Sequence, residues 1–139
     1  MKRKIHIELL ATSGLAILLT LTFALFVFYG LFQAQIIRDL KTDARVMKNM
    51  GVFDDISGMA EKNGSISSED LRITVVSPGG SVLFDSSADA AAMGNHEDRP
   101  EIRTALEVGE GSGSRRSETM DKNLFYYAVR LENGNVLRI

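Results

Sequence analysis

The side chains that could bind a cation or an anion lie in two short polar segments. His96-Glu97-Asp98 could present an imidazole and two carboxylates to a cation, although three consecutive residues do not easily point at one ion. Arg99 and the pair Arg115-Arg116 could bind a carboxylate or a phosphate through paired N–H donors. The alternative for these residues is structural: a loop histidine held by hydrogen bonds, and exposed charges joined in ion pairs.

No arrangement of residues typical of an enzyme is visible. His6, the only other histidine, lacks the neighbours of a phosphoacceptor histidine. The run Gly109–Ser114 is rich in glycine but lacks the spacing of a phosphate-binding loop, and we expect a flexible loop there. No nucleophile elbow or triad spacing is present. We therefore predict no catalytic residues, no metal site and no cofactor within these 139 residues.

The bulk composition narrows the possible classes of function. The chain has no cysteine, so disulfides and thiolate metal sites are excluded. Its net charge is −2, and the residues after Phe32 carry more acidic than basic side chains. Without a basic stripe to neutralise phosphates, we expect no nucleic-acid partner.

The elements that must position the polar residues begin with an apolar segment. Leu9 to Phe32 is a run of 24 residues without a charged side chain, and about 20 residues of helix cross a bilayer core of about 30 Å. Lys2, Arg3 and Lys4 precede this run and predict a cytoplasmic N-terminus. We therefore expect a cytoplasmic lead over residues 1–8, a transmembrane helix over 9–32 and an extracytoplasmic domain over 33–139.

This apolar segment has two alternative interpretations. A cleaved signal peptide has an apolar core of about 7–15 residues followed by a small-x-small cleavage site. Here the core is longer, and Phe32-Gln33-Ala34-Gln35 lacks that pattern. A buried core helix fits neither the length nor the basic flank. We therefore favour an uncleaved membrane anchor.

The extracytoplasmic part begins with helical periodicity and then changes to strands. Apolar residues recur every three or four positions from Gln33 to about Glu61, with a bend expected near Gly51, and Asn63-Gly64 marks a turn. The two turn signals near the end are Gly109, expected to stop a short helix, and Asn133-Gly134, expected to form a tight hairpin. The remaining elements are strands at 71–76 and 82–85, a connection over 86–98, that short helix capped by Asp98, and strands at about 114–119, 124–131 and 135–139.

This order of elements predicts an α+β fold. A five-stranded antiparallel sheet packs its one apolar face against the long helix, which continues from the transmembrane helix. Such a helix would carry a displacement of the sheet to the membrane. The segment Val136–Ile139 has the pattern of a strand that breaks off, so we expect the sequence to be truncated in its last strand.

Three segments of the extracytoplasmic part resemble a known family. They are Leu71–Ser86, Asn95–Ile102, and Asn123–Val129 followed by Gly134 and Val136–Arg138. Together they resemble the two hairpins and the helix entry of the PAS-like (PDC/Cache-like) sensor of phosphate-regulon-type histidine kinases. The layout is similar from Met1 to Ile139.

The resemblance implies the sensing end of a two-component receptor in the bacterial cell membrane. Such a receptor is a homodimer that autophosphorylates a histidine from ATP and Mg²⁺ and passes the phosphoryl group to a response regulator. The kinase parts have no counterpart in this sequence. In PAS-like exported sensors a small-molecule ligand lies between the sheet and the connecting loop. The resemblance therefore implies five candidate ligand-binding residues: Asp85, His96, Arg99, Arg115 and Tyr127.

Other outputs and other classes of protein remain open at this point. The same sensor could serve a chemotaxis receptor or a cyclic-nucleotide synthase. A membrane-anchored surface or adhesion protein is an alternative of a different class, whereas an anchored hydrolase has no residue support.

Overall fold

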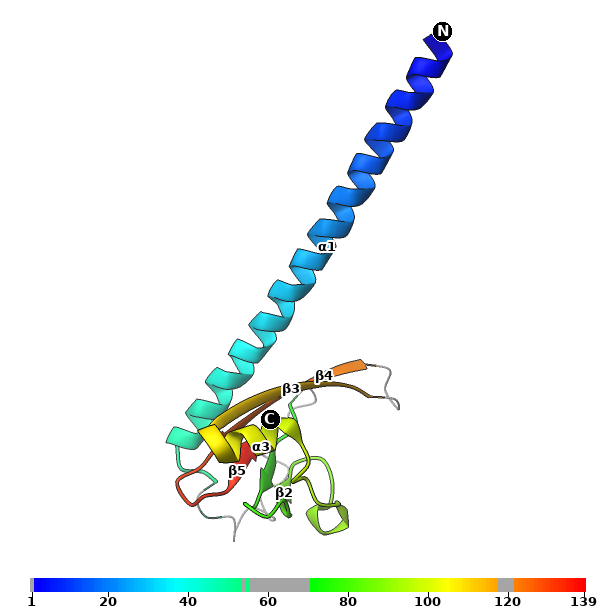
Figure 1. Ribbon diagram of the computed structural model, residues 1–139. Helices are drawn as coiled ribbons and strands as arrows, with labels where there is room; N and C mark the ends of the chain where they lie inside the picture. Colours follow the sequence, from blue (N-terminus) through cyan, green and yellow to red (C-terminus); the bar gives the residue numbers. More distant parts are fainter. Residues whose placement is uncertain (1, 54, 56–70, 118–121) are drawn as a thin grey trace. The chain divides into compact units, whose positions relative to one another are not determined.

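The computed structural model describes residues 2–53, 55, 71–117 and 122–139 (Figure 1). The chain divides into two compact units, Met1–Gln35 and Ile36–Ile139. Its elements, in order, are α1 (Lys2–Asn49), β1 (Thr74–Val76), β2 (Val82–Asp85), the 3₁₀ turn η2 (Ala90–Ala92), α3 (Pro100–Val108), β3 (Glu110–Ser117), β4 (Lys122–Arg130) and β5 (Val136–Arg138).

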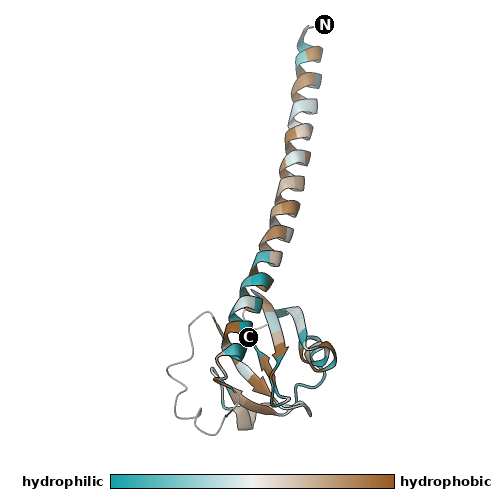
Figure 2. Ribbon diagram, turned by 90° about the vertical axis from the view of Figure 1, so that its left-hand side faces the viewer, coloured by the Kyte–Doolittle hydropathy of each residue, from teal (hydrophilic) through white to brown (hydrophobic). Residues whose placement is uncertain are grey.

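The first unit consists of the N-terminal part of α1, a largely hydrophobic helix (Figure 2). Its large apolar side chains are exposed. Every side chain from Leu9 to Phe32 is exposed. The hydroxyls of Thr20 and Thr22 donate hydrogen bonds of 2.8 Å to carbonyls one turn earlier, so these polar groups are satisfied within the helix. By length and composition, α1 is the one helix in the described part of the chain that could cross a membrane.

The second unit is built on a five-stranded sheet with the order β2-β1-β5-β4-β3, in which all neighbours are antiparallel. The last strand, β5, lies in the middle, where Thr74 of β1 and Ala128 of β4 both pair with Arg138. The Asn133-Gly134 turn leads into it as expected: Gly134 has φ +87°, and the Leu131 N–H donates to the Asn135 carbonyl. The predicted α+β fold is confirmed.

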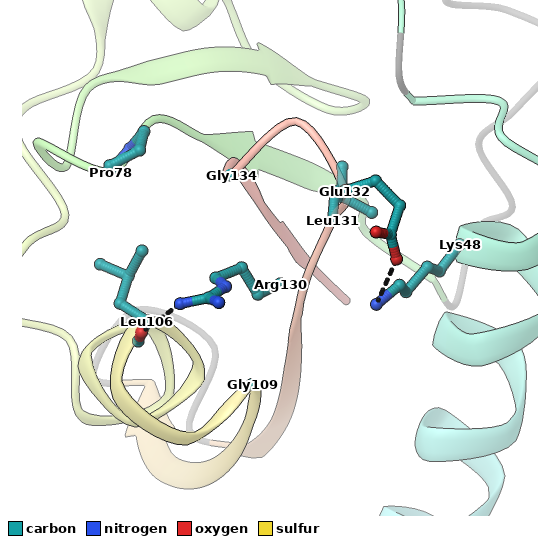
Figure 3. Close-up of a pocket in the computed structure, with 8 residues that line it drawn as sticks. All are labelled: Lys48, Pro78, Leu106, Gly109, Arg130, Leu131, Glu132 and Gly134. Carbon is teal, nitrogen blue, oxygen red and sulfur yellow. Dashed lines mark hydrogen bonds and ion pairs between the residues drawn. The ribbon is translucent and has the colours of Figure 1, made fainter.

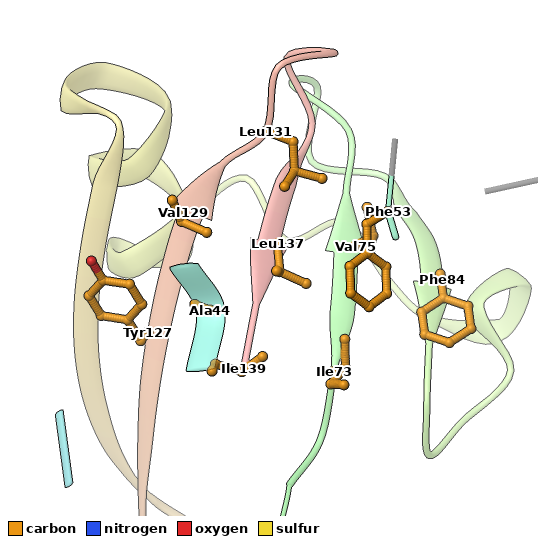
Figure 4. Close-up of a cluster of buried hydrophobic side chains, with 10 residues drawn as sticks. All are labelled: Ala44, Phe53, Ile73, Val75, Phe84, Tyr127, Val129, Leu131, Leu137 and Ile139. Carbon is orange, nitrogen blue, oxygen red and sulfur yellow. The ribbon is translucent and has the colours of Figure 1, made fainter. Parts of the chain in front are cut away.

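One face of the sheet carries the main apolar core, which we call the α1-face core (Figure 4). Alternate residues of the strands point to this face, because successive side chains in a strand point to opposite sides. The C-terminal part of α1 covers the core with Ala44, which is fully buried. The buried members of the core are Ala44, Phe53, Ile73, Val75, Phe84, Tyr127, Val129, Leu131, Leu137 and Ile139.

The opposite face is buried too, which the sequence pattern did not predict. All four residues from Ile73 to Val76 are buried, because α3 packs against β3, β4 and β5 on the side that Val76 faces. A second apolar cluster, the α3-face cluster, consists of Val76, Ile102, Ala105, Ala128 and Val136. The sheet therefore has two buried faces, not the single apolar face expected.

The prediction of a flexible loop at Gly109–Ser114 is wrong, because the chain forms β3 from Glu110 onward. Residues Glu110 to Ser117 pair with β4 along their whole length. The glycines serve close packing rather than flexibility: a Cβ on Gly111 would lie 2.3 Å from the Glu101 carbonyl oxygen of α3. The glycine-rich composition thus allows α3 to lie directly on the strand.

The helix ends also differ from the expected ones. Arg99, not Asp98, is the N-cap of α3, and it makes no side-chain cap hydrogen bond because a guanidinium group has no acceptor atom. Pro100 occupies the first turn. Gly109 ends α3 in the left-handed region as predicted, with φ +96°. The long helix α1 ends at Asn49, ahead of Gly51 with φ +63°. The expected helix beyond Gly51 and the Asn63-Gly64 turn lie outside the described residues.

Candidate functional site

Charged and polar side chains gather on the α3 face of the sheet, beside the α3-face cluster. Thr74 pairs with both Asp85 and Arg138, so these three residues form a row across β2, β1 and β5. They share the face of Val76 and Val136, and they are between 1% and 7% exposed. Burial of two opposite charges at one level of a sheet requires close partners for both.

Asp85 is a fully engaged anion. Its carboxylate accepts hydrogen bonds from the Arg72 Nε (3.0 Å), the Thr74 hydroxyl (2.8 Å) and the backbone N–H groups of Ser87 and Ala88 (2.9 Å each). Burial by itself would raise the pKa of Asp85, but these hydrogen bonds lower it below its ordinary value. The arrangement fixes the end of β2 and the loop after it.

Glu101 and Arg138 form the second buried charge pair of this face. Glu101 lies in the first turn of α3, and its Oε1 is 2.9 Å from the Arg138 Nε and 3.8 Å from the nearest Arg115 nitrogen. Both guanidinium groups lie over the Tyr126 ring, whose centroid is 4.0 Å from the Arg138 Cζ and 5.1 Å from the Arg115 Cζ. Burial lowers the pKa of Arg138, and the charge of Glu101 opposes that shift.

His96 lies beside these charges and is 7% exposed. Its backbone N–H donates to the Gly80 carbonyl (2.8 Å), which ties the loop to the turn between β1 and β2. Burial lowers the pKa of His96, and the positive charges of Arg138 and Arg72 lower it further. The imidazole is therefore neutral at neutral pH, and its Nδ1 has no hydrogen-bond partner in the described part of the chain.

The proposed cation ligands next to His96 do not converge. Glu97 and Asp98 are exposed, whereas His96 is buried. Asp98 instead lies 3.5 Å from Arg103 in an exposed ion pair. Among the described residues, no group of three or more histidine, aspartate or glutamate side chains could hold a metal ion.

Of the five residues that the resemblance implied for ligand binding, Asp85 and Arg115 face α3 but lie on β2 and β3, the opposite edges of the sheet. His96 lies close enough to Asp85 to feel its charge. Arg99 lies at the start of α3, where its backbone carbonyl accepts from the Ile102 and Arg103 N–H groups. Tyr127 lies on the other face, in the α1-face core, because it is the neighbour of Tyr126 in β4 and successive residues alternate. The structure thus separates Tyr127 from the other candidates by the thickness of the sheet.

Tyr127 belongs to a group of charges at the rim of the α1 face, centred on Glu110. The Glu110 carboxylate accepts from the Tyr127 hydroxyl (2.5 Å) and from the Lys41 Nζ (2.5 Å) and Arg45 Nη2 (3.0 Å) of α1. Its hydrogen bond from Lys41, followed by that from Tyr127, lowers the pKa of Glu110 to about 2. Burial, together with the Glu110 charge, raises the pKa of Tyr127. This group joins α1 to the edge strand β3.

One open cavity in this unit lies away from the buried charges, near the ends of α1 and α3 (Figure 3). It has a volume of about 650 Å³. Its charged side chains point to partners rather than into free space: Arg130 donates to the Leu106 carbonyl (2.9 Å), and Lys48 lies 3.4 Å from Glu132. The lining residues are Lys48, Pro78, Leu106, Gly109, Arg130, Leu131, Glu132 and Gly134, and they include none of the five candidates.

We call the charged and polar group on this face the α3-face site; its residues are Asp85, His96, Glu101, Arg115, Tyr126 and Arg138. Sequence reasoning missed three of them: Glu101, Tyr126 and Arg138. Arg138 had a signal, because it is a charged residue between apolar neighbours at the end of a predicted strand. Tyr126 could have been placed opposite Tyr127 by strand alternation. Glu101 had no signal, since an acidic residue in the first turn of a helix is ordinary on an exposed surface.

Comparison with known proteins adds the family. The family model described as Single Cache-like matches residues 42–137, which is more than half of the chain. The chain belongs to the Single Cache-like family. Single Cache-like domains are extracellular sensor modules found in histidine kinases and chemoreceptors. No curated protein matches the sequence. The match covers α3, the strands β1 to β4 and β5 up to Leu137, so it includes Glu101, Arg115 and Tyr126 and ends one residue before Arg138.

Proposed function

We propose that this chain is the signal-sensing region of a two-component sensor histidine kinase of the phosphate-regulon type. The proposal depends on one observation above all: an extracellular sensor domain, matched from residue 42, directly follows the charge-free segment Leu9–Phe32. In this proposal residues 1–8 are cytoplasmic, 9–32 span the bacterial cell membrane and the rest lies outside. The whole receptor is a homodimer, and its kinase part supplies the ATP and Mg²⁺ chemistry and a response regulator as partner.

A small-molecule ligand would act on the α3 face in this proposal. His96 and Arg115 border the buried charges there, and Asp85 fixes the loop after β2. Arg99 begins α3, the helix that carries Glu101. Tyr127 would act from the other side of the sheet, through its hydrogen bond to Glu110. A ligand works only if it has different affinities for two arrangements of the domain, and α1 would carry that difference toward the membrane.

The orientation in the membrane can be tested cleanly because the chain has no cysteine. We introduce Ala92→Cys, at an exposed position of η2, or Lys4→Cys, in the basic lead, as the matched control. A membrane-impermeant maleimide added to intact cells should label Ala92→Cys and should label Lys4→Cys only after the membrane is opened. The reverse pattern would contradict the proposed topology, and labelling of a released, shorter Ala92→Cys protein would indicate a cleaved signal peptide.

The signalling role requires an output measurement. We expect the chain, joined through a second transmembrane helix to the cytoplasmic part of a histidine kinase and placed in lipid nanodiscs, to set the autophosphorylation rate. Arg115→Ala should change that rate, whereas Glu97→Ala, an exposed change in the same domain, should not. Equal rates for both variants and the unchanged chain would overturn the sensing role of the α3 face.

A chemoreceptor is the second candidate function, because the Single Cache-like family is found in chemoreceptors as well as in kinases. A cyclic-nucleotide synthase is a third possible output for the same sensor. Joining the chain through a second transmembrane helix to the signalling part of a chemoreceptor, and measuring swimming reversals, distinguishes the chemoreceptor from the kinase. A response there, without one in the kinase fusion, would favour the chemoreceptor.

A further inference from the structure

Glu101 is an unusual residue to bury beneath a helix. It is 2% exposed, although it lies in the first turn of α3. Two arginines on different strands approach its carboxylate: Arg138 of β5 at 2.9 Å and Arg115 of β3 at 3.8 Å. Two positive groups thus meet one negative group, so this position retains a surplus of positive charge.

The two arginines are held by more than the carboxylate. Tyr126 places its ring beside both guanidinium groups, at 4.0 Å from the Arg138 Cζ and 5.1 Å from the Arg115 Cζ. The face of an aromatic ring attracts a guanidinium group, and a planar guanidinium stacks well on it. The ring therefore keeps both donors in place whether or not a carboxylate lies between them.

The backbone of β3 leaves room at the same place. Gly113 pairs with Tyr126, and a Cβ on Gly113 would lie 3.0 Å from the Glu101 Oε2. A Cβ on Gly111 would meet the backbone of Glu101 itself. Two glycines in alternate positions of one strand therefore form a recess on the α3 face, and the Glu101 side chain fills it.

Glu101 occupies this recess imperfectly. Its Oε1 and the Arg138 Nε are close enough for an ion pair, yet their alignment gives neither atom a hydrogen bond in the described part of the chain. A buried carboxylate with good partners usually makes two aligned N–H···O bonds to a guanidinium. The desolvation cost of such a pair is repaid only when the geometry is good. A free carboxylate, which can turn to align with both arginines, would satisfy the site better than this tethered one.

We propose that Arg115, Tyr126 and Arg138 form a carboxylate-binding site whose occupant in this structure is the chain's own Glu101. An external carboxylate competes with Glu101 for the two arginines, and its binding releases the first turn of α3 from the sheet. This inference rests on the proposed sensing function, and it names the ligand class and the contact that the ligand breaks. The site is therefore self-occupied in the absence of its signal.

The tether determines how strongly Glu101 competes. A group held by a short connection has an effective concentration on the order of millimolar or more. An external carboxylate must exceed that competition, so the unchanged protein should bind one weakly. Removing the Glu101 carboxylate should expose the site and tighten binding by at least about tenfold, which corresponds to about 1.4 kcal/mol.

The test uses the full chain in lipid nanodiscs, with sodium acetate and sodium propionate as probes. Acetamide and sodium chloride at matched ionic strength serve as neutral and ionic controls. Glu101→Ala removes the internal carboxylate, and Glu107→Ala removes an exposed one from the same helix. We expect acetate and propionate to raise the melting temperature of Glu101→Ala at concentrations about tenfold lower than for the unchanged chain or Glu107→Ala.

Acetamide and chloride should leave Glu101→Ala unaffected, and Arg138→Gln added to Glu101→Ala should abolish the acetate effect. The proposal is overturned if acetamide stabilises Glu101→Ala as well as acetate does. It is also overturned if the unchanged chain responds to acetate as strongly as the variant.

A second measurement covers the case in which Glu101→Ala does not fold. In the unchanged chain, acetate should shift the NMR signals of the Arg115 and Arg138 side chains and of the Gly113 amide, but not that of Gly79 in the β1–β2 turn. Unmoved signals up to high acetate would then contradict the proposal. These binding measurements need no kinase: acetate binding without any effect on the kinase fusion would refute the sensing function alone, and a responsive fusion without acetate binding would refute this inference alone.

Discussion

The two faces of the sheet are covered by helices that use different kinds of contact. On one face, α1 packs on aliphatic and aromatic side chains, and its charged contacts stay at the rim around Glu110. On the other face, α3 covers a smaller apolar cluster and a row of buried charges that includes Glu101 and Arg138. Apolar contact is non-directional and scales with area, whereas a buried ion pair depends on geometry and on every partner. The α1 face therefore supplies most of the stability, and the α3 face is the one that a small change in charge can rearrange.

The largest effect should come from the α1-face core. Leu137 is fully buried in the middle of the sheet, and Leu137→Ala removes side-chain contacts and leaves a cavity. We expect a loss of about 2–5 kcal/mol in the free energy of unfolding, measured by chemical denaturation of the chain in detergent. Leu83→Ala, at a position 41% exposed in β2, is the control and should change the stability by about 0.5 kcal/mol or less. Equal losses for the two variants would remove the distinction drawn between the faces.

An intermediate effect is expected from the packing of α3 on β3. Gly111→Ala would place a Cβ 2.3 Å from the Glu101 carbonyl oxygen, so α3 must move away from the strand. Overpacking of this kind costs about 1–3 kcal/mol, and the melting temperature should fall accordingly. Gly79→Ala, which meets no atom within 4 Å, is the matched control. A Gly111→Ala protein as stable as the control would mean that α3 does not need its close approach to β3.

The smallest effect, and one that depends on pH, belongs to the rim of the α1 face. Glu110→Gln removes the charge that Lys41 and Arg45 contact, and because the Glu110 side chain is 37% exposed we expect a loss of about 1 kcal/mol or less at neutral pH. The folded pKa is about 2, against an ordinary value of 4.5. A lowered carboxyl pKa stabilises the fold above the ordinary pKa, and this stabilisation is lost as the pH falls from about 4.5 toward 2.

Melting curves of the unchanged chain and of Glu110→Gln should therefore differ by a constant amount above pH 4.5 and converge below it. Glu107→Gln, at an exposed position of α3, is the control for removing a carboxylate and should change the stability at neutral pH by about 0.5 kcal/mol or less. A difference that grows as the pH falls would contradict the assigned direction of the Glu110 shift.

Local pattern was enough to predict the strands and the order of elements. Alternation of residues identified β1, the turn after it identified β2 as the returning strand, and Asn133-Gly134 identified the last hairpin. These features depend on near neighbours in the sequence, so they can be recognised without the fold. The left-handed conformation of Gly109 at the end of α3 was predictable for the same reason.

Features that depend on distant residues escaped prediction. Gly111 and Gly113 are typical of a loop when the sequence is considered alone. In the fold they belong to β3, where the absence of a Cβ lets α3 pack closely on the strand. Glu101 can be buried as a charged group because the fold brings Arg138 of β5, which comes much later in the sequence, to within ion-pair distance of it. Tyr127 was assigned with the α3-face residues because residue type alone does not tell which side of a sheet a tyrosine faces.

The central position of β5 has a consequence for how this domain is made. A chain that emerges N-terminus first can form the β1–β2 hairpin early and the β3–β4 ribbon later, but neither ribbon touches the other except through β5. Before Val136–Arg138 is synthesised, the β1–β2 hairpin and the β3–β4 ribbon both have unpaired edges, and such edges can pair with strands of other chains. Non-local pairing of this kind slows folding. Pairing of β5 therefore completes the sheet, and aggregation of the nascent domain is most favoured before that strand has paired.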